Sequence, residues 1–353
     1  MKGIRRVLLM ITAWVGLISC QENEIIDQPV LDLVPPGVFV VNEGNFTFGN
    51  ASLTYYQSDK KTLTPDVFYT ANGVPLGDVA NFMVIDQRDA YIVVNNSGVI
   101  YNMDVQTGIY KGKVSGLTSP RELLLLGDGK GLVSDLTASS LTVIDLDKFA
   151  VIDKIPLDKR TSESMVKVEN KVYVCNWSGM YQEKKNDQVL VVDLETWNLT
   201  DSIRVTLEPN SMVVDHQGFV WVLCGGGYMS ETFPALYKID VSGDTIVTKY
   251  EFPDKQSTPT DLCVNGDGNR LYFLNKNVYS MSINDGELSQ EALIEAGDRR
   301  FYSLGVDPFS GDLYVSDAID YMQKGDVMIF DSAGTPKNSF KAGIIPGFFA
   351  FFE

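Results

Sequence analysis

The chain has 353 residues, of which 44% are hydrophobic and 21% charged, a composition that suits one large globular core and excludes a disordered or collagen-like chain. Its 46 acidic and 29 basic side chains give a net charge of −17, which argues against charge-driven binding of nucleic acid or anionic lipid headgroups. A single histidine, His216, is too few for most zinc sites and histidine-based triads. We therefore expect a protein that is not an enzyme and holds no metal.

The N-terminus predicts export and lipid anchoring. Basic residues within residues 2–6 precede an apolar run over residues 7–17, shorter than the ~20 residues that span a bilayer. The tetrad Leu17-Ile18-Ser19-Cys20 resembles the lipobox of bacterial lipoproteins. That resemblance implies a signal peptide over residues 1–19, cleavage before Cys20 and lipidation of its thiol. The alternative is an ordinary secretory peptide with a coincidental cysteine.

Two further segments follow the cysteine. Residues 20–36 show little hydrophobic periodicity and are expected to form a flexible tether, and residues 37–353 show no internal change of composition that would mark a linker. Residues 21–24 (QENE) resemble the acidic export signal of lipoproteins displayed on the outer face of the outer membrane. We expect an outer-membrane protein that faces the cell exterior and is anchored rather than membrane-spanning.

The remainder of the chain repeats a short apolar strand that ends in a polar residue or cysteine. Copies recur every 40 to 53 residues, the period of propeller blades with four strands each. They occupy residues 38–42, 91–95, 131–135, 172–176, 220–224, 271–275 and 313–317. This count predicts an all-β, seven-bladed β-propeller. A β-sandwich or two smaller β domains are the alternative folds.

A second strand precedes six of these core strands, and its seventh copy has none after it. The copies occupy residues 80–83, 120–123, 162–165, 209–212, 259–262, 301–304 and 346–349. The last copy lies at the C-terminus, whereas the first core strand has no such strand before it. We therefore expect the C-terminal strand to complete the first blade and close the ring, which removes two free sheet edges.

Blade-equivalent positions converge on one mouth of a propeller channel. The core strand is antiparallel to the inner strand, so the end of one meets the start of the other. The core strands end in Asn, Asp or Cys, for example Asp135, and these residues either bind ligand or cap turns. The inner strands open with a more diverse set, which turn capping does not explain: Asn81, Arg121, Glu163, Asn210, Thr260, Tyr302 and Gly347.

Aromatic and amide side chains follow these positions in the loops, where they offer wide contact area to a large ligand. We expect the following ligand-binding residues at this mouth: Asn45, Phe46, Asn81, Asn96, Arg121, Asp135, Glu163, Trp177, Asn210, Tyr228, Thr260, Lys276, Tyr302 and Tyr321. Alternating strand directions place His216 at the opposite mouth of the channel. We therefore do not expect it to coordinate the metal of a ligand bound at the predicted mouth.

The first repeat carries a family resemblance. Residues 41–46 (VNEGNF) and 49–56 (GNASLTYY) look like the first blade of YncE-like seven-bladed propeller surface lipoproteins, most similar to the BtuG type. The resemblance implies binding of cobalamin (vitamin B12) or another corrinoid and its delivery to a TonB-dependent transporter of the BtuB type. Cobalamin would then be a transported ligand, and no cofactor is expected.

Two other functions stay open. The same face would also suit binding of glycan or protein partners. A metal-dependent lactonase- or lyase-like propeller enzyme is the second alternative, with acidic pairs such as Asp135 and Glu163 as candidate groups.

Overall fold

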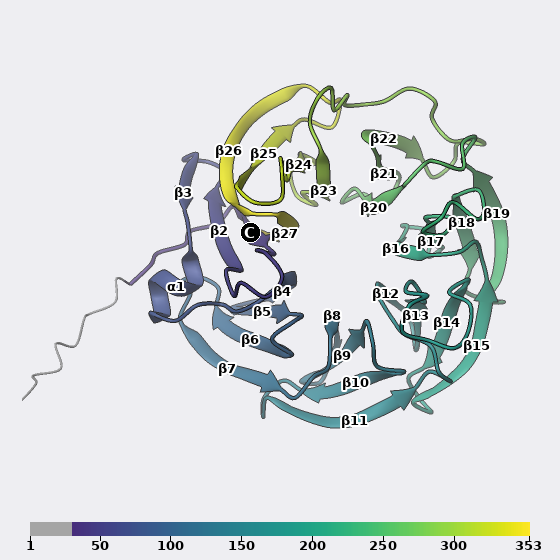
Figure 1. The fold of residues 1–353 in the computed structure, drawn as a ribbon, viewed down its shortest axis with the longest axis horizontal. Helices are drawn as coiled ribbons and strands as arrows, with labels where there is room; N and C mark the ends of the chain where they lie inside the picture. Colours follow the sequence, from purple (N-terminus) through teal and green to yellow (C-terminus); the bar gives the residue numbers. More distant parts are fainter. Residues whose placement is uncertain (1–29) are drawn as a thin grey trace, which may run out of the picture.

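In the computed structural model, which describes residues 30–353, seven antiparallel sheets stand around a central axis (Figure 1). The predicted seven-bladed β-propeller is confirmed. The signal peptide over residues 1–19 and the lipidation site Cys20 lie outside the described residues. Within residues 30–353, no helix is long and apolar enough to cross a membrane.

The strands of each blade are ordered from the axis outward. Blade one contains β27 (Pro346–Phe352), β1 (Gly37–Asn42), β2 (Ser52–Gln57) and β3 (Thr62–Thr64), and blade two contains β4 (Ala80–Asp86), β5 (Asp89–Val94), β6 (Val99–Asp104) and β7 (Tyr110–Ser115). Blade three contains β8 (Pro120–Gly127), β9 (Lys130–Asp135), β10 (Ser140–Asp145) and β11 (Ala150–Pro156), and blade four contains β12 (Met165–Val168), β13 (Lys171–Cys175), β14 (Gln188–Asp193) and β15 (Asn198–Arg204). Blade five contains β16 (Pro209–Val214), β17 (Val220–Cys224), β18 (Ala235–Asp240) and β19 (Thr245–Glu251), and blade six contains β20 (Thr260–Val264), β21 (Arg270–Asn275) and β22 (Asn277–Ser282). Blade seven contains β23 (Phe301–Val306), β24 (Leu313–Asp317), β25 (Lys324–Phe330) and β26 (Pro336–Ile344). The helix α1 (Val67–Asn72) lies between β3 and β4.

The second strand of each blade is buried on both faces because it packs against the blades before and after it. Every residue of β1 and of β17 is buried, which explains why these strands are continuous apolar runs rather than alternating ones. The core therefore consists of apolar layers between neighbouring blades. One such layer joins Val40 of blade one to Tyr314 and Ile329 of blade seven.

The C-terminal strand closes the ring as the sequence predicts. β27 pairs antiparallel with β1, and Val40 lies opposite Phe349. The Phe349 ring is buried and lies 5.9 Å from the ring of Tyr314, centroid to centroid. The last residues of the chain therefore hold the first and seventh blades together.

Blade six departs from the expectation of four strands per blade, since its sheet has three. Residues 284–300 follow β22, where a fourth strand was expected, and lack an alternating apolar pattern. A single bridge, Val278 to Ile294, ties this segment to the blade, and buried Leu288 and Ile294 anchor it. The prediction of four strands in every blade was wrong here.

The closing strand gives a stability prediction. Phe349→Ala should lower the free energy of unfolding by about 3 kcal/mol, because it removes a buried aromatic ring from the layer between the first and last blades. Phe309→Ala, in the exposed turn between β23 and β24, should change it by less than about 0.5 kcal/mol. Urea unfolding followed by tryptophan fluorescence measures both values. Equal effects would contradict the closure described here.

Two buried asparagines give a matched pair of substitutions. The side chain of Asn42 donates to Ser52 and Thr54 and accepts from the Gly343 N–H, whereas neither amide atom of Asn102 has a hydrogen-bond partner within residues 30–353. Both side chains are almost fully buried. Asn102→Leu should raise the free energy of unfolding by about 1 kcal/mol, and Asn42→Leu should lower it by about 2 kcal/mol. A destabilised N102L variant would contradict the assignment.

Candidate functional site

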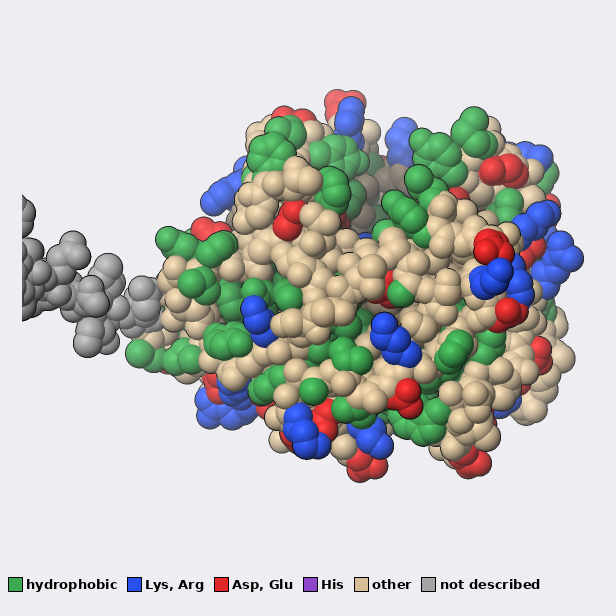
Figure 2. Space-filling model, turned by 60° about the horizontal axis from the view of Figure 1, so that its bottom comes forward, with side chains coloured by type: hydrophobic (Ala, Val, Ile, Leu, Met, Phe, Trp, Pro, Cys, Tyr) green, Lys and Arg blue, Asp and Glu red, His purple; other side chains and the backbone are tan. Residues whose placement is uncertain are grey.

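A cavity of about 1010 Å³ opens at one mouth of the central channel. A hollow at the centre of the ring, with hydrophobic side chains around it, is visible in the space-filling view (Figure 2). The seven residues predicted to open the inner strands all line the cavity: Asn81, Arg121, Glu163, Asn210, Thr260, Tyr302 and Gly347. Alignment of the blades therefore located this wall of the cavity correctly.

Register shifts near the start of the inner strands add a second residue to the lining. In β8 the pairing skips from Pro120 to Leu123, and in β20 it skips from Thr260 to Cys263. Such an irregularity lets two successive residues face the same side. Arg121 and Glu122 both line the cavity for this reason, as do Thr260 and Asp261.

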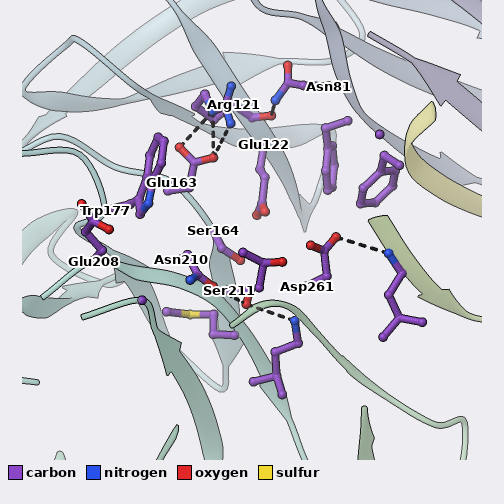
Figure 3. Close-up of a pocket in the computed structure, with 18 of the residues that line it drawn as sticks. Asn81, Arg121, Glu122, Glu163, Ser164, Trp177, Glu208, Asn210, Ser211 and Asp261 are labelled. Carbon is purple, nitrogen blue, oxygen red and sulfur yellow. Dashed lines mark hydrogen bonds and ion pairs between the residues drawn. The ribbon is translucent and has the colours of Figure 1, made fainter. Parts of the chain in front are cut away.

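Two polar contacts link neighbouring blades at the mouth. The Arg121 guanidinium donates to both carboxylate oxygens of Glu163, with its Nη2 2.6 Å from Oε1 (Figure 3). The Tyr302 hydroxyl donates to Glu43 Oε1 at 2.9 Å. The first contact joins blades three and four, and the second joins blades seven and one. These bonds fix the positions of the four side chains.

The second lining residue also bonds to the next blade. The Met165 N–H donates to Glu122 Oε2 at 2.9 Å, and the Leu304 N–H donates to Asp261 Oδ1 at 3.4 Å. A hydroxyl does the same in blade five, where Ser211 accepts the bond from the next inner strand. The polar lining of the channel therefore satisfies backbone N–H groups that the irregular pairing leaves free.

Burial raises the pKa of four carboxyl groups in the cavity, those of Glu43, Glu122, Glu208 and Asp261. It raises the pKa of Glu122 to about 8, against a bond from the Met165 N–H that lowers it. It raises the pKa of Glu43 to about 7 and that of Asp261 to about 6. The low-dielectric surroundings of the channel therefore favour the neutral acid form of these groups.

Five further predicted residues lie in the cavity lining or in the loops around its mouth. The Asn45 side chain donates to the Tyr321 carbonyl at 2.6 Å, and the Tyr321 ring lies edge-on to Tyr302, with centroids 5.7 Å apart. Phe46 lies exposed in the same loop as Asn45. Trp177 and Tyr228, also predicted, line the cavity directly.

Six predicted residues lie outside the cavity lining: Asn45, Phe46 and Tyr321 of the neighbouring loops, and Asn96, Asp135 and Lys276. Asp135 is buried and accepts bonds from backbone N–H groups at residues 119, 137 and 138, so it caps a turn. The Asn96 side chain donates to Asp78 Oδ2 at 2.5 Å. Lys276 is exposed in the turn between β21 and β22. His216 lies in the turn between β16 and β17, at the mouth opposite the cavity.

Sequence reasoning missed four acidic residues of the lining: Glu43, Glu122, Glu208 and Asp261. A signal for two of them was available in the inner strands, where Glu122 directly follows Arg121 and Asp261 directly follows Thr260. Each of these acids precedes a buried leucine, which is an unusual place for a carboxyl group. Strict alternation of strand side chains hid it. Within residues 30–353, no group of three His, Cys, Asp or Glu side chains is arranged to hold a metal ion.

An apolar rim surrounds the mouth. Its members project from the loops between the second and third strands of blades one, four, five and seven, and they include Tyr228, which is 90% exposed. The rim consists of Phe46, Phe48, Met180, Tyr181, Tyr228, Met229, Tyr321 and Met322. Exposed apolar patches of this kind mark binding surfaces.

The family follows from residues 36–345, which match the model described as a domain of unknown function, DUF5074. The chain belongs to this family. No curated protein matches the sequence. The DUF5074 match covers every strand from β1 to β26 and ends directly before the closing strand β27.

Solved structures support the fold. A quinoprotein alcohol dehydrogenase-like protein from Bacteroides thetaiotaomicron is similar at a TM-score of 0.68 and 18% identity, over 90% of this chain and 78% of that one. Hydrazine synthase of Kuenenia stuttgartiensis is similar at a TM-score of 0.59 and 13% identity, over 75% of this chain and 87% of that one. Apo AztD of Citrobacter koseri is similar at a TM-score of 0.57 and 10% identity, over 89% of this chain and 97% of that one. At these identities the likeness extends to the fold alone.

The raised carboxyl pKa values predict how stability depends on pH. A carboxyl group whose folded pKa exceeds its unfolded value stabilises the fold below the unfolded pKa, and this contribution is lost as pH rises through the folded pKa. The free energy of unfolding should therefore fall between pH 5 and pH 8.5, as Glu43 and Glu122 ionise. Glu122→Gln should flatten this fall, whereas Glu287→Gln, at an exposed site, should leave it unchanged. Urea unfolding across this pH range measures the slope, and an identical slope in E122Q would contradict the prediction.

Proposed function

We propose that this DUF5074 propeller is a non-enzymatic surface lipoprotein that captures cobalamin or a related corrinoid at the cavity mouth and passes it to a TonB-dependent transporter of the BtuB type. It would be anchored through Cys20 in the outer membrane and face the cell exterior. The observation that carries the proposal is a wide preformed cavity whose mouth combines polar groups with exposed aromatic rings.

The chemistry of a corrin suits this arrangement. A corrin is a broad, partly apolar ring with amide-bearing side chains around its edge, so it needs both wide contact surfaces and many hydrogen-bonding groups. Trp177 and Tyr228 offer flat surfaces at the mouth, while Glu43, Glu122 and Asp261 offer carboxyl groups inside it. Because bonds across the blade junctions already hold these carboxyl groups in place, ordering them on binding costs little conformational entropy.

The apolar rim supports delivery to a protein partner. Tyrosine, phenylalanine and methionine predominate in it, and such residues are enriched in protein interfaces. Methionine side chains such as Met180, Met229 and Met322 adapt to uneven partner surfaces. A transporter that docks on the rim would cover the cavity mouth, so that ligand passes between the two proteins without release into bulk water.

Calorimetry with cyanocobalamin tests the proposed function. Titration of the purified propeller, residues 21–353, should give saturable heat at micromolar ligand. Trp177→Ala and Tyr228→Ala should each weaken binding by about tenfold, since aromatic contacts at a site commonly contribute more than 1 kcal/mol. Phe309→Ala, an exposed aromatic at the opposite mouth, is the matched control and should bind as the parent does.

Three results would count against the proposal. No heat and no thermal shift with cyanocobalamin would remove corrinoid capture. Equal loss in the Phe309 and Tyr228 variants would show that the cavity mouth is not the binding face. Binding of a glycan panel at the same mouth, with no corrinoid binding, would support the alternative of a glycan-binding propeller.

A further inference from the structure

Most of the nitrogen-bearing side chains of the cavity already donate hydrogen bonds within the protein. Arg121 gives its Nε and Nη2 protons to Glu163. The Asn81 amide nitrogen donates to the Arg121 carbonyl at 2.7 Å, and the Asn210 amide nitrogen donates to the Pro259 carbonyl at 2.8 Å. Among the lining side chains of the described chain, the Nη1 group of Arg121, held beside the Glu163 carboxylate, and the indole of Trp177 remain as N–H donors.

Acceptors, by contrast, are in surplus. A carboxyl group has two oxygens with two lone pairs each, so the bonds that Glu43, Glu122 and Asp261 accept from their neighbours across a blade junction leave further lone pairs free. Independently, the buried side-chain oxygen of Asn81 has no hydrogen-bond partner within residues 30–353. This surplus matches a ligand that brings its own hydrogen-bond donors.

The charge of the lining points the same way. Its carboxyl groups come from blades one, three, four, five and six, whereas its one guanidinium group, on Arg121, is paired with Glu163. The titratable groups that face one another across the cavity are Glu43, Arg121, Glu122, Glu163, Glu208, Tyr228, Asp261, Cys263 and Tyr302. Once these carboxyl groups have ionised, an anion that enters this space meets like charges, and it finds no unpaired cation among the described lining residues.

We propose that the central cavity selects a ligand arm that carries N–H donors and no negative charge, an amide or an ammonium group, and rejects the corresponding carboxylate. This inference rests on the proposed function where the ligand is a corrinoid, because it then names the part of the ligand that enters the channel. The rejection strengthens as pH rises, since Glu43, Glu122 and Asp261 then lose protons that would otherwise be shared with an incoming carboxylate.

A pair of corrinoids tests the selection. Cyanocobalamin should bind at least about tenfold more tightly at pH 8 than its monocarboxylic acid derivatives, in which one edge amide is hydrolysed. At pH 5.5 the difference should shrink. The double variant Glu122→Gln, Asp261→Asn should reduce it at pH 8, because amide oxygens still accept the N–H bonds from Met165 and Leu304 but carry no charge. Equal affinities at both pH values would overturn the inference while leaving corrinoid capture intact.

If neither corrinoid binds, the proposed function fails, and a thermal-shift comparison of spermidine with citrate decides the inference. Spermidine should raise the melting temperature of the parent chain and citrate should not, and the double variant should lose most of the shift. A shift by citrate, no shift by spermidine, or an undiminished spermidine shift in the double variant would each overturn the selection of uncharged or cationic arms. The Glu287→Gln variant serves as a control for the overall negative charge of the chain.

Discussion

Pairing of β27 with β1 is the constraint on which the rest of the molecule depends. Seven blades form a rigid ring only when the last strand completes the first blade, and Phe349 lies opposite Val40 in that pairing. A closed ring leaves no incomplete blade at the junction of the two chain ends and holds every blade between two neighbours. The channel, its mouth and its polar lining keep their geometry because the C-terminus is fixed within a buried layer.

Within this ring, irregular pairing of the inner strands gives the channel a polar lining. Irregular registers turn Arg121 and Glu122 toward the same space, and the freed N–H of Met165 in the next blade is satisfied by the Glu122 carboxyl. One group thus both joins two blades and lines the cavity. Burial in turn raises the pKa of Glu122 to about 8, so the cost of placing this acid in the channel is reduced by keeping it protonated near neutral pH.

Blade alignment in the sequence predicted the fold, its closure and seven lining positions, because repeated strands transfer a position from one blade to the next. It did not predict Glu122 or Asp261, since a register shift has no marker in a short apolar strand and strict alternation turns these residues away from the axis. It left open whether Asp135 binds or caps, which depends on the path of the following turn. Blade alignment also did not predict that blade six lacks a fourth strand, because residues 284–300 are held by only a few apolar anchors such as Leu288.

The attachment of the N-terminal segment bears on how the mouth is used. The Leu33 N–H donates to the Gln106 carbonyl, and the Ser58 N–H donates to the Pro36 carbonyl. Both contacts lie at the end of the ring opposite the cavity, since Gly37 pairs with Phe352 at that end of the closing strand and Asn42 pairs with Pro346 at the mouth. An anchor at Cys20 would therefore join the propeller at the face away from the apolar rim. A partner that docks on the rim then competes with neither the anchor nor the ring closure, and capture and delivery would share one face.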